Sequence, residues 1–290
     1  MAYFKQRKWL YLLALPAVLF FMMYIIIPFF ISLYYSFTNY QGFGAAKWIG
    51  LKNYQNLWKS RLFWRSLKNT AETTLTVLVF LVPIAFVIAL LLHSVKGLSN
   101  FYKTFLFAPV IISSVISGIA WVFILEPGSG LINTLLRKIG LGALTQQWIG
   151  GLVLTPYSVA LVYIWQQAGY IATILLAALK QIPSELYEAA RIDGANRMQI
   201  VFHLEIPMVR ESFFIVYVLS LTGALKVFDT VRMLTDGGPN RMSESLLTFM
   251  YNTTYVDGVV CMGNAISVII FLITFGFSLV MIRLYSAQQA

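Results

Sequence analysis

Charged residues are scarce in this sequence. Asp, Glu, Lys and Arg make up only 11% of its 290 residues, while 59% are apolar and 16% aromatic. An ordinary soluble domain carries about 25% charged residues. The composition therefore excludes a soluble globular chain and indicates a membrane protein, in which each spanning helix needs about 20 apolar residues.

Cysteine and histidine are almost absent as well. Cys261 is the single cysteine, and His93 and His203 are the two histidines. One cysteine excludes an internal disulfide and a thiolate metal cage, and two histidines are too few for a histidine-based metal site. The sequence also lacks the glycine-rich phosphate loop of nucleotide-binding proteins. We therefore expect no catalytic residue, no metal and no cofactor in this chain.

Long stretches without charge predict the membrane-spanning helices, because a charge at the bilayer centre costs about 2.5 to 3.5 kcal/mol on insertion scales. Each such stretch predicts one helix, and the stretches are 9–46, 73–95, 104–125, 139–179 and 258–282. A further stretch, 212–225, is too short for the hydrocarbon core, so we expect its helix to continue past Lys226 and Asp229. The pattern predicts an all-α membrane protein with about six transmembrane helices.

The remaining charges are unevenly distributed. Lys and Arg number 21 against 11 Asp and Glu, which favours contact with membrane lipid or a charged partner over nucleic acid. Lys226, Asp229 and Arg232 are spaced by three, so we expect them on one helical face, either neutralising one another or meeting a solute or its delivery protein. The aromatic stretch 47–68 is typical of an interfacial helix.

The loop 181–207 differs from the other connections because it combines charges with apolar residues. Ser184 is placed to cap a short helix, and Gly194 can end that helix in the left-handed conformation. A second short helix follows, and we expect Met198, Val201 and Phe202 on one of its faces. Two short helices that meet at a glycine predict a compact knob outside the membrane, suited to a groove on a partner protein.

This loop also carries a family resemblance. Glu188-Ala189-Ala190, Asp193-Gly194-Ala195 and Ile206-Pro207 resemble the EAA loop of permease subunits of bacterial ATP-binding-cassette (ABC) importers. Residues 48–54 and 234–239 are similar to motifs of the carbohydrate-importing branch, the group of the maltose and glycerol-3-phosphate permeases. The resemblance implies a type I importer permease fold (MetI-like) and a single transmembrane permease domain over residues 1–290.

The same resemblance implies where the loop lies and what it binds. Residues 181–207 would be cytoplasmic, with both termini on that side of the bacterial inner membrane; the Lys and Arg count alone leaves the orientation open. The implied partners are a second permease subunit in a heterodimer, two cytoplasmic ATPase subunits that bind ATP and Mg, and an extracytoplasmic solute-binding protein. The residues implied to couple the chain to the ATPase are Glu188, Ala189, Ala190, Asp193, Gly194 and Pro207.

A solute site follows from laying the site-bearing subunit of the maltose permease over this chain at Pro109, Trp165 and residues 235–239. Its sugar-contacting positions fall on Ser114, Gln167, Tyr170, Ser220, Ala224 and Val227. Ala224 and Val227 depart from the amides of that protein, so the ligand differs or relies on other groups. Ser114 and Ser220 are equally well explained as hydroxyls that bond their own helix backbone.

Alternatives to sugar import stay open at this point. The same coupling loop would serve a permease for a non-sugar solute, and an ion-coupled secondary carrier would need no ATPase. The scarcity of acidic residues within the spans weakens the second alternative, because proton-driven and ion-driven carriers usually keep such residues at mid-membrane. The surplus of basic residues is consistent with either an acidic oligosaccharide or an acidic binding protein.

Overall fold

The computed structural model describes residues 13–94, 99–151 and 153–289, and within them the chain is helical, with one isolated β-bridge between Thr38 and Trp48 and no strand. The chain divides into two compact units, which we describe separately. The first comprises residues 13–60 with Met250–Leu272, and the second comprises Arg61–Phe249 with residues 273–289.

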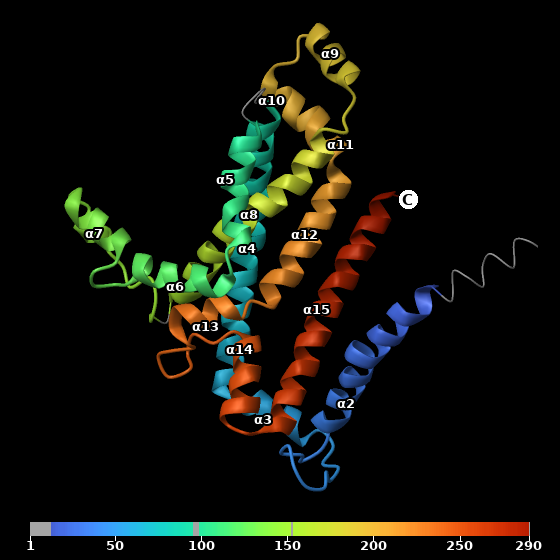
Figure 1. The fold of residues 1–290 in the computed structure, drawn as a ribbon, viewed down its shortest axis with the longest axis vertical. Helices are drawn as coiled ribbons and strands as arrows, with labels where there is room; N and C mark the ends of the chain where they lie inside the picture. The colour runs from blue at the N-terminus through green and yellow to red at the C-terminus, as the bar shows by residue number, and fades with distance from the viewer. Residues whose placement is uncertain (1–12, 95–98, 152, 290) are drawn as a thin grey trace, which may run out of the picture. The chain divides into compact units, whose positions relative to one another are not determined.

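Membrane-spanning helices account for most of the described chain (Figure 1). Helices long and apolar enough to span are Leu13–Ser36, Arg61–Ser94, Thr155–Leu179 and Val260–Arg283. Two further spans are bent: Thr104–Ile111 with Ser114–Leu125 by 101°, and Arg197–Met208 with Arg210–Leu225 by 72°. Counting each bent pair as one span gives 6 in the described residues, which agrees with the sequence prediction.

The first unit joins the N-terminal span to the start of the last one. The N-terminal span contains η1 (Met22–Ile26) and α2 (Ile27–Ser36), and Phe29 lies 4.4 Å from Phe271, which belongs to α15 (Val260–Gln289). The buried Asn53 amide donates to the carbonyls of Ser36 and Thr38, both at 2.8 Å. Asn53 thereby fixes α3 (Lys52–Lys59) beneath the end of α2.

The interfacial helix expected over 47–68 is shorter than predicted. The α3 helix ends at Lys59, Ser60 adopts an extended conformation, and Arg61 already begins the long helix α4 (Arg61–Ser94). The aromatic and basic residues after Arg61 therefore belong to a spanning helix.

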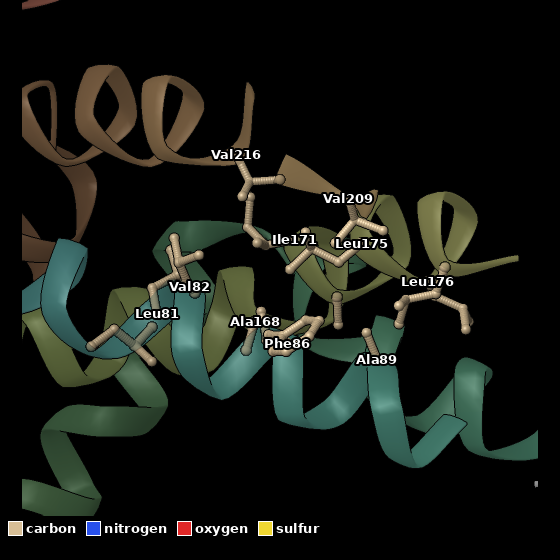
Figure 2. Packing of buried hydrophobic residues seen from close by; sticks show 14 of the residues in the cluster. Leu81, Val82, Phe86, Ala89, Ala168, Ile171, Leu175, Leu176, Val209 and Val216 are labelled. Atoms are coloured by element: carbon tan, nitrogen blue, oxygen red, sulfur yellow. The ribbon is translucent and has the colours of Figure 1, made fainter. Parts of the chain in front are cut away.

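The second unit is built around α4 and α8 (Thr155–Leu179), with α5 (Ser99–Ile111) and α12 (Arg210–Leu225) packed against them. Figure 2 shows the apolar core between these helices, formed by Leu81, Val82 and Phe86 of α4, Ala168 and Leu175 of α8, and Val216 of α12. Small residues permit this closeness: a Cβ on Gly169 would lie 1.8 Å from the Leu106 carbonyl oxygen of α5.

The third predicted span is broken, not straight. Pro109 lies in α5, and the chain turns at Ile112 and Ser113 before α6 (Ser114–Leu125) begins. A break in a spanning helix leaves carbonyls without helical partners, which is costly in a membrane. The buried Gln166 amide of α8 donates to the Ile112 carbonyl at 3.0 Å, so the neighbouring helix satisfies the break.

The fifth span does not gain length where we predicted it. The α12 helix ends at Leu225, with the Lys226 amide bonded to the Gly223 carbonyl at 3.1 Å, and α13 (Asp229–Thr235) is a separate helix that packs on α6. The prediction that the helix continues past Lys226 and Asp229 is therefore wrong. Three short segments precede α12 across the 72° bend: α10 (Arg197–Ile200), η3 (Val201–Glu205) and α11 (Ile206–Met208).

The remaining elements lie in connections. They are α7 (Leu131–Lys138), η2 (Gly142–Leu144), α9 (Ser184–Ile192), α14 (Leu246–Tyr251) and η4 (Asn252–Val256). In the loop after α6, the buried Asn133 of α7 bonds Pro127 O and Gln146 O, both at 2.8 Å, and accepts from the Trp148 indole at 2.8 Å. One amide thus holds this connection together.

Candidate functional site

The knob predicted for residues 181–207 is present as α9, a glycine turn and α10, which lie together at one end of the second unit (Figure 1). Gly194 has a φ of +79°, the left-handed conformation that glycine adopts without strain. Its amide bonds Arg191 O at 3.1 Å, and the Ala195 amide bonds Ala190 O at 2.9 Å. These two bonds are the Schellman pair that ends a helix, so the predicted glycine stop is confirmed.

The caps of the two short helices differ from the prediction. Pro183, not Ser184, occupies the N-cap position of α9, and no side chain caps that end. Asn196 caps α10 instead: its side chain accepts from the Gln199 amide at 2.9 Å, while the Gln199 side chain accepts from the Asn196 amide at 2.7 Å. The Asn-x-x-Gln spacing is a capping-box pattern and would have predicted this start.

The predicted coupling residues gather on the surface of the knob. Glu188, Ala189, Asp193, Gly194 and Pro207 are exposed, and Ala190 is partly so. The knob also exposes large apolar side chains, with Ile192 85%, Met198 62% and Phe202 57% accessible. The expectation that Val201 shares their face is wrong, because Val201 is buried in the core. Exposed apolar groups among charges are typical of a surface that another protein covers.

A hollow of 410 Å³ lies between the end of α9 and the segment formed by α10 and η3. Its lining consists of Ala190, Asp193, Gly194, Ala195, Gln199, Ile200, His203 and Leu204. Three of the predicted coupling residues therefore border one concave surface, which offers both a carboxylate and an imidazole to a partner side chain.

The predicted solute residues fall into two groups. Ser220, Ala224 and Val227 are buried, with accessible fractions of 2%, 2% and 6%. The Ser220 hydroxyl has no hydrogen-bond partner within the described part of the chain. In this conformation these three side chains offer no surface to a solute.

The other three predicted solute residues remain accessible. Tyr170 of α8 is 39% exposed, and Gln167 of the same helix is partly exposed. Ser114, at the first turn of α6, donates to the exposed Asp229 carboxylate of α13 at 2.6 Å. Trp121 and Trp165 contact each other edge to face at 5.6 Å on the same helices, α6 and α8. Aromatic faces and amides on neighbouring helices are suited to sugar rings and hydroxyl groups.

The charged trio near Ser114 does not share a helical face, because Lys226 caps α12 while Asp229 and Arg232 belong to α13. Arg232 instead pairs with Asp236 at 2.6 Å, and Asp229 accepts the Ser114 hydroxyl. The trio is therefore not the self-neutralising cluster we considered.

The polar face at the start of α4 is a feature that the sequence reasoning missed. Asn69 donates to the carbonyls of Met242 and Glu244, each at 2.9 Å, and Thr70 accepts the Leu246 amide at 2.8 Å. These bonds hold the segment that follows the family-like motif at 234–239. In the sequence, the polar residues near the start of the otherwise apolar α4 are what would have indicated this face.

Several apolar helices long enough to cross a membrane, two bent pairs and an exposed knob are the features of a multi-pass membrane protein. Residues 81–289 match the family described as "Binding-protein-dependent transport system inner membrane component", and the chain belongs to this family. It is a transport subunit and not an enzyme.

Known relatives agree over nearly the whole chain. The probable ABC transporter permease protein YurN of Bacillus subtilis (strain 168) is 36% identical over 282 residues, covering 96% of each chain. The probable starch degradation products transport system permease protein AmyD of Thermoanaerobacterium thermosulfurigenes is 30% identical over 291 residues, covering 99% of this chain and 97% of AmyD.

A solved structure has the same fold. A chain of a bacterial ABC transporter involved in the import of the acidic polysaccharide alginate superposes with a TM-score of 0.85 at 25% identity, covering 98% of each chain. The fold is thus that of ABC importer permeases, and the protein is a multi-pass membrane protein.

Proposed function

We propose that this chain is a permease subunit of an ABC importer that moves a sugar or oligosaccharide across the inner membrane. A binding protein delivers the solute on the outer side, and separate ATPase subunits supply the energy. Similarity to AmyD and to the alginate transporter chain supports a carbohydrate, and the accessible Gln167 and Tyr170 offer an amide and a ring of the kind that bind one.

The observation that carries this proposal is the knob of residues 181–207. It presents Glu188, Asp193 and Gly194 on its surface, and no residue of α9 is buried by the chain itself. An exposed helix with apolar and acidic groups is suited to a groove on a partner. We assign that partner as an ATPase, which holds ATP and Mg in its own site, with Glu188 as the anchor and Ala189 and Ala190 allowing close approach.

The proposed mechanism uses the knob as a lever. Closure of two ATPase subunits around ATP would draw the knobs of two permease subunits together and rock the bundles from inward-open to outward-open. A heterodimer of this chain with a second permease would enclose the solute path. Because four spans precede the knob and two follow it, a cytoplasmic knob would put both termini in the cytoplasm.

The solute path would be lined by the six positions carried over from the maltose permease, which are Ser114, Gln167, Tyr170, Ser220, Ala224 and Val227. The first three are accessible and would meet the solute first. Ser220, Ala224 and Val227 are buried, so they would contact it only after the bundle opens.

Reconstitution tests the proposal directly. The permease, its partner permease, the ATPase and the binding protein are assembled in proteoliposomes, with maltodextrins and alginate oligosaccharides as probes. We expect one probe class to stimulate ATP hydrolysis and to accumulate inside the vesicles. Uptake driven by an imposed ion gradient without ATP would instead identify a secondary carrier and overturn the proposal.

A further inference from the structure

The coupling helix α9 is held to the rest of the protein by few contacts. None of its residues is buried, and its half-buried Tyr187 is the side chain that packs on the apolar core of the second unit. The Tyr187 ring lies 5.9 Å from the His93 ring at the end of α4. A helix with so little packing needs another constraint if it is to transmit force.

A buried carboxylate supplies that constraint. Glu205, the last residue of η3, is fully buried, at 0% exposure. Its Oε1 atom accepts a hydrogen bond from Arg197 Nη1 at 2.9 Å and another from the Tyr187 hydroxyl at 3.3 Å. Its Oε2 atom has no hydrogen-bond partner among the described residues. Because a buried charge is unfavourable without partners, Arg197 and Tyr187 are what make this position tolerable.

The three side chains lie on opposite sides of the glycine turn. Tyr187 belongs to α9, before Gly194, whereas Arg197 and Glu205 belong to α10 and η3, after it. A Cβ built on Gly194 would meet no atom within 4 Å, so no side chain packs over the turn itself. The contacts through Glu205 therefore brace the turn and connect α9 to the residue that precedes Ile206 and Pro207.

The state of the Tyr187 phenol is consistent with this role. Burial and the neighbouring Glu205 carboxylate raise the pKa of Tyr187 to about 12. The hydroxyl therefore keeps its proton at physiological pH and remains a donor to the carboxylate.

We infer that Tyr187, Arg197 and Glu205 form a brace across Gly194 that makes α9 move as one body with α10 and η3, so that these three are positioning residues for coupling. This inference rests on the proposed function, because it specifies how force reaches the spans from the loop that contacts the ATPase. None of the three was among the coupling residues predicted from the sequence.

A spin label on α9 tests the brace without any knowledge of the solute. The label is placed at the exposed position of Ile192 by Ile192→Cys, in a Cys261→Ala background that removes the single native thiol, in the full-length permease in lipid nanodiscs. Tyr187→Phe removes one oxygen and keeps the ring. We expect it to shift the braced-to-free ratio of α9 by about tenfold, equivalent to about 1.4 kcal/mol, as for loss of a hydrogen bond to a charged group.

Two further comparisons separate bracing from general damage. Tyr217→Phe, at another half-buried tyrosine of the same core, is the matched control and should leave the label spectrum unchanged. Arg197→Glu and Glu205→Arg should each mobilise the label, and the double variant, which restores an ion pair, should recover part of the wild-type spectrum. A wild-type spectrum from Tyr187→Phe, or equal mobilisation by Tyr217→Phe, would overturn the inference.

The functional readout is the amount of solute moved per ATP hydrolysed in proteoliposomes of the whole complex, with the maltodextrin and alginate probes. We expect Tyr187→Phe to lower this ratio while ATP hydrolysis continues. If the wild-type complex responds to neither probe, the proposed function fails whatever the spin label reports. If the wild-type complex responds and Tyr187→Phe keeps the wild-type ratio, only the brace fails.

Discussion

Gly169 and Gly194 represent two regions of this protein that use the same residue type for opposite reasons. Gly169 belongs to α8 and faces α5, where a Cβ would meet the Leu106 carbonyl oxygen at 1.8 Å. Gly194 has no atom within 4 Å of its would-be Cβ, but its φ of +79° excludes most side chains. The bundle needs glycine for space, and the knob needs it for backbone shape. Gly169 thus serves contacts within the chain, whereas Gly194 shapes the surface that we propose another protein covers.

The largest effect is expected at Gly169, because the obstructing atom is backbone. Gly169→Val should separate α5 from α8 and cost at least about 1–3 kcal/mol of stability, the usual range for overpacking. The measurement is thermal unfolding of the purified permease, monitored through its loss of monodispersity. Gly276→Ala in α15 is the control, since nothing lies within 4 Å of that position and its stability should hold. Equal melting of Gly169→Val and the wild type would contradict the packing argument.

A smaller effect on stability but a large one on coupling is expected at Gly194. Gly194→Val forces a β-branched residue into the left-handed region, at a cost of about 1–2 kcal/mol that falls on the turn between α9 and α10. The bundle should stay folded while ATP hydrolysis is uncoupled from uptake. Gly194→Asn, which tolerates this conformation, should retain most transport. Normal transport by the Gly194→Val variant would show that the knob takes no part in coupling.

The bundle also depends on a polar contact made by Gln166. Comparing Gln166 with its neighbour Gln167 separates a structural role from a role in solute binding. Gln166→Leu leaves the Ile112 carbonyl at the α5–α6 break without its donor and should cost about 1–3 kcal/mol. Gln167→Leu, on the accessible side of α8, should leave the melting temperature unchanged and lower uptake. Comparing melting curves and uptake rates of the two variants tests this division. A reversed pattern would mean that Gln167 is structural and Gln166 contacts solute.

The mildest structural effect is expected at Tyr170. Tyr170 is 39% exposed, so Tyr170→Ala removes a partly buried side chain, and we expect assembly with the partner subunits to stay intact. Uptake should fall because a stacking surface for the solute is lost. Co-purification of the complex and the transport rate are measured on the same preparation, and unchanged uptake would exclude Tyr170 from the solute path.

The sequence predicted those features that depend on local chemistry. Charge-free stretches located the spans, since the cost of a buried charge depends on residue type alone, and Gly194 was predicted to end α9 because its flexibility is intrinsic. Features that depend on neighbours in space were missed. The break after Ile111 needs Gln166 from another helix, and the brace needs Glu205 from beyond the turn. The exposure of the predicted solute residues could not be read from the sequence either, because burial of Ser220 and Ala224 depends on how the whole bundle is arranged.

The N-terminal span differs from the other spans in one further respect. The most apolar window of Leu13–Ser36 has none of its residues buried by the chain, whereas 61% of the corresponding window of Thr155–Leu179 is buried. The surface of that window is thus left for lipid or another protein to cover. The membrane or a partner subunit, rather than the chain's own core, therefore sets which side chains this window tolerates, while α8 is constrained by the helices that pack on it.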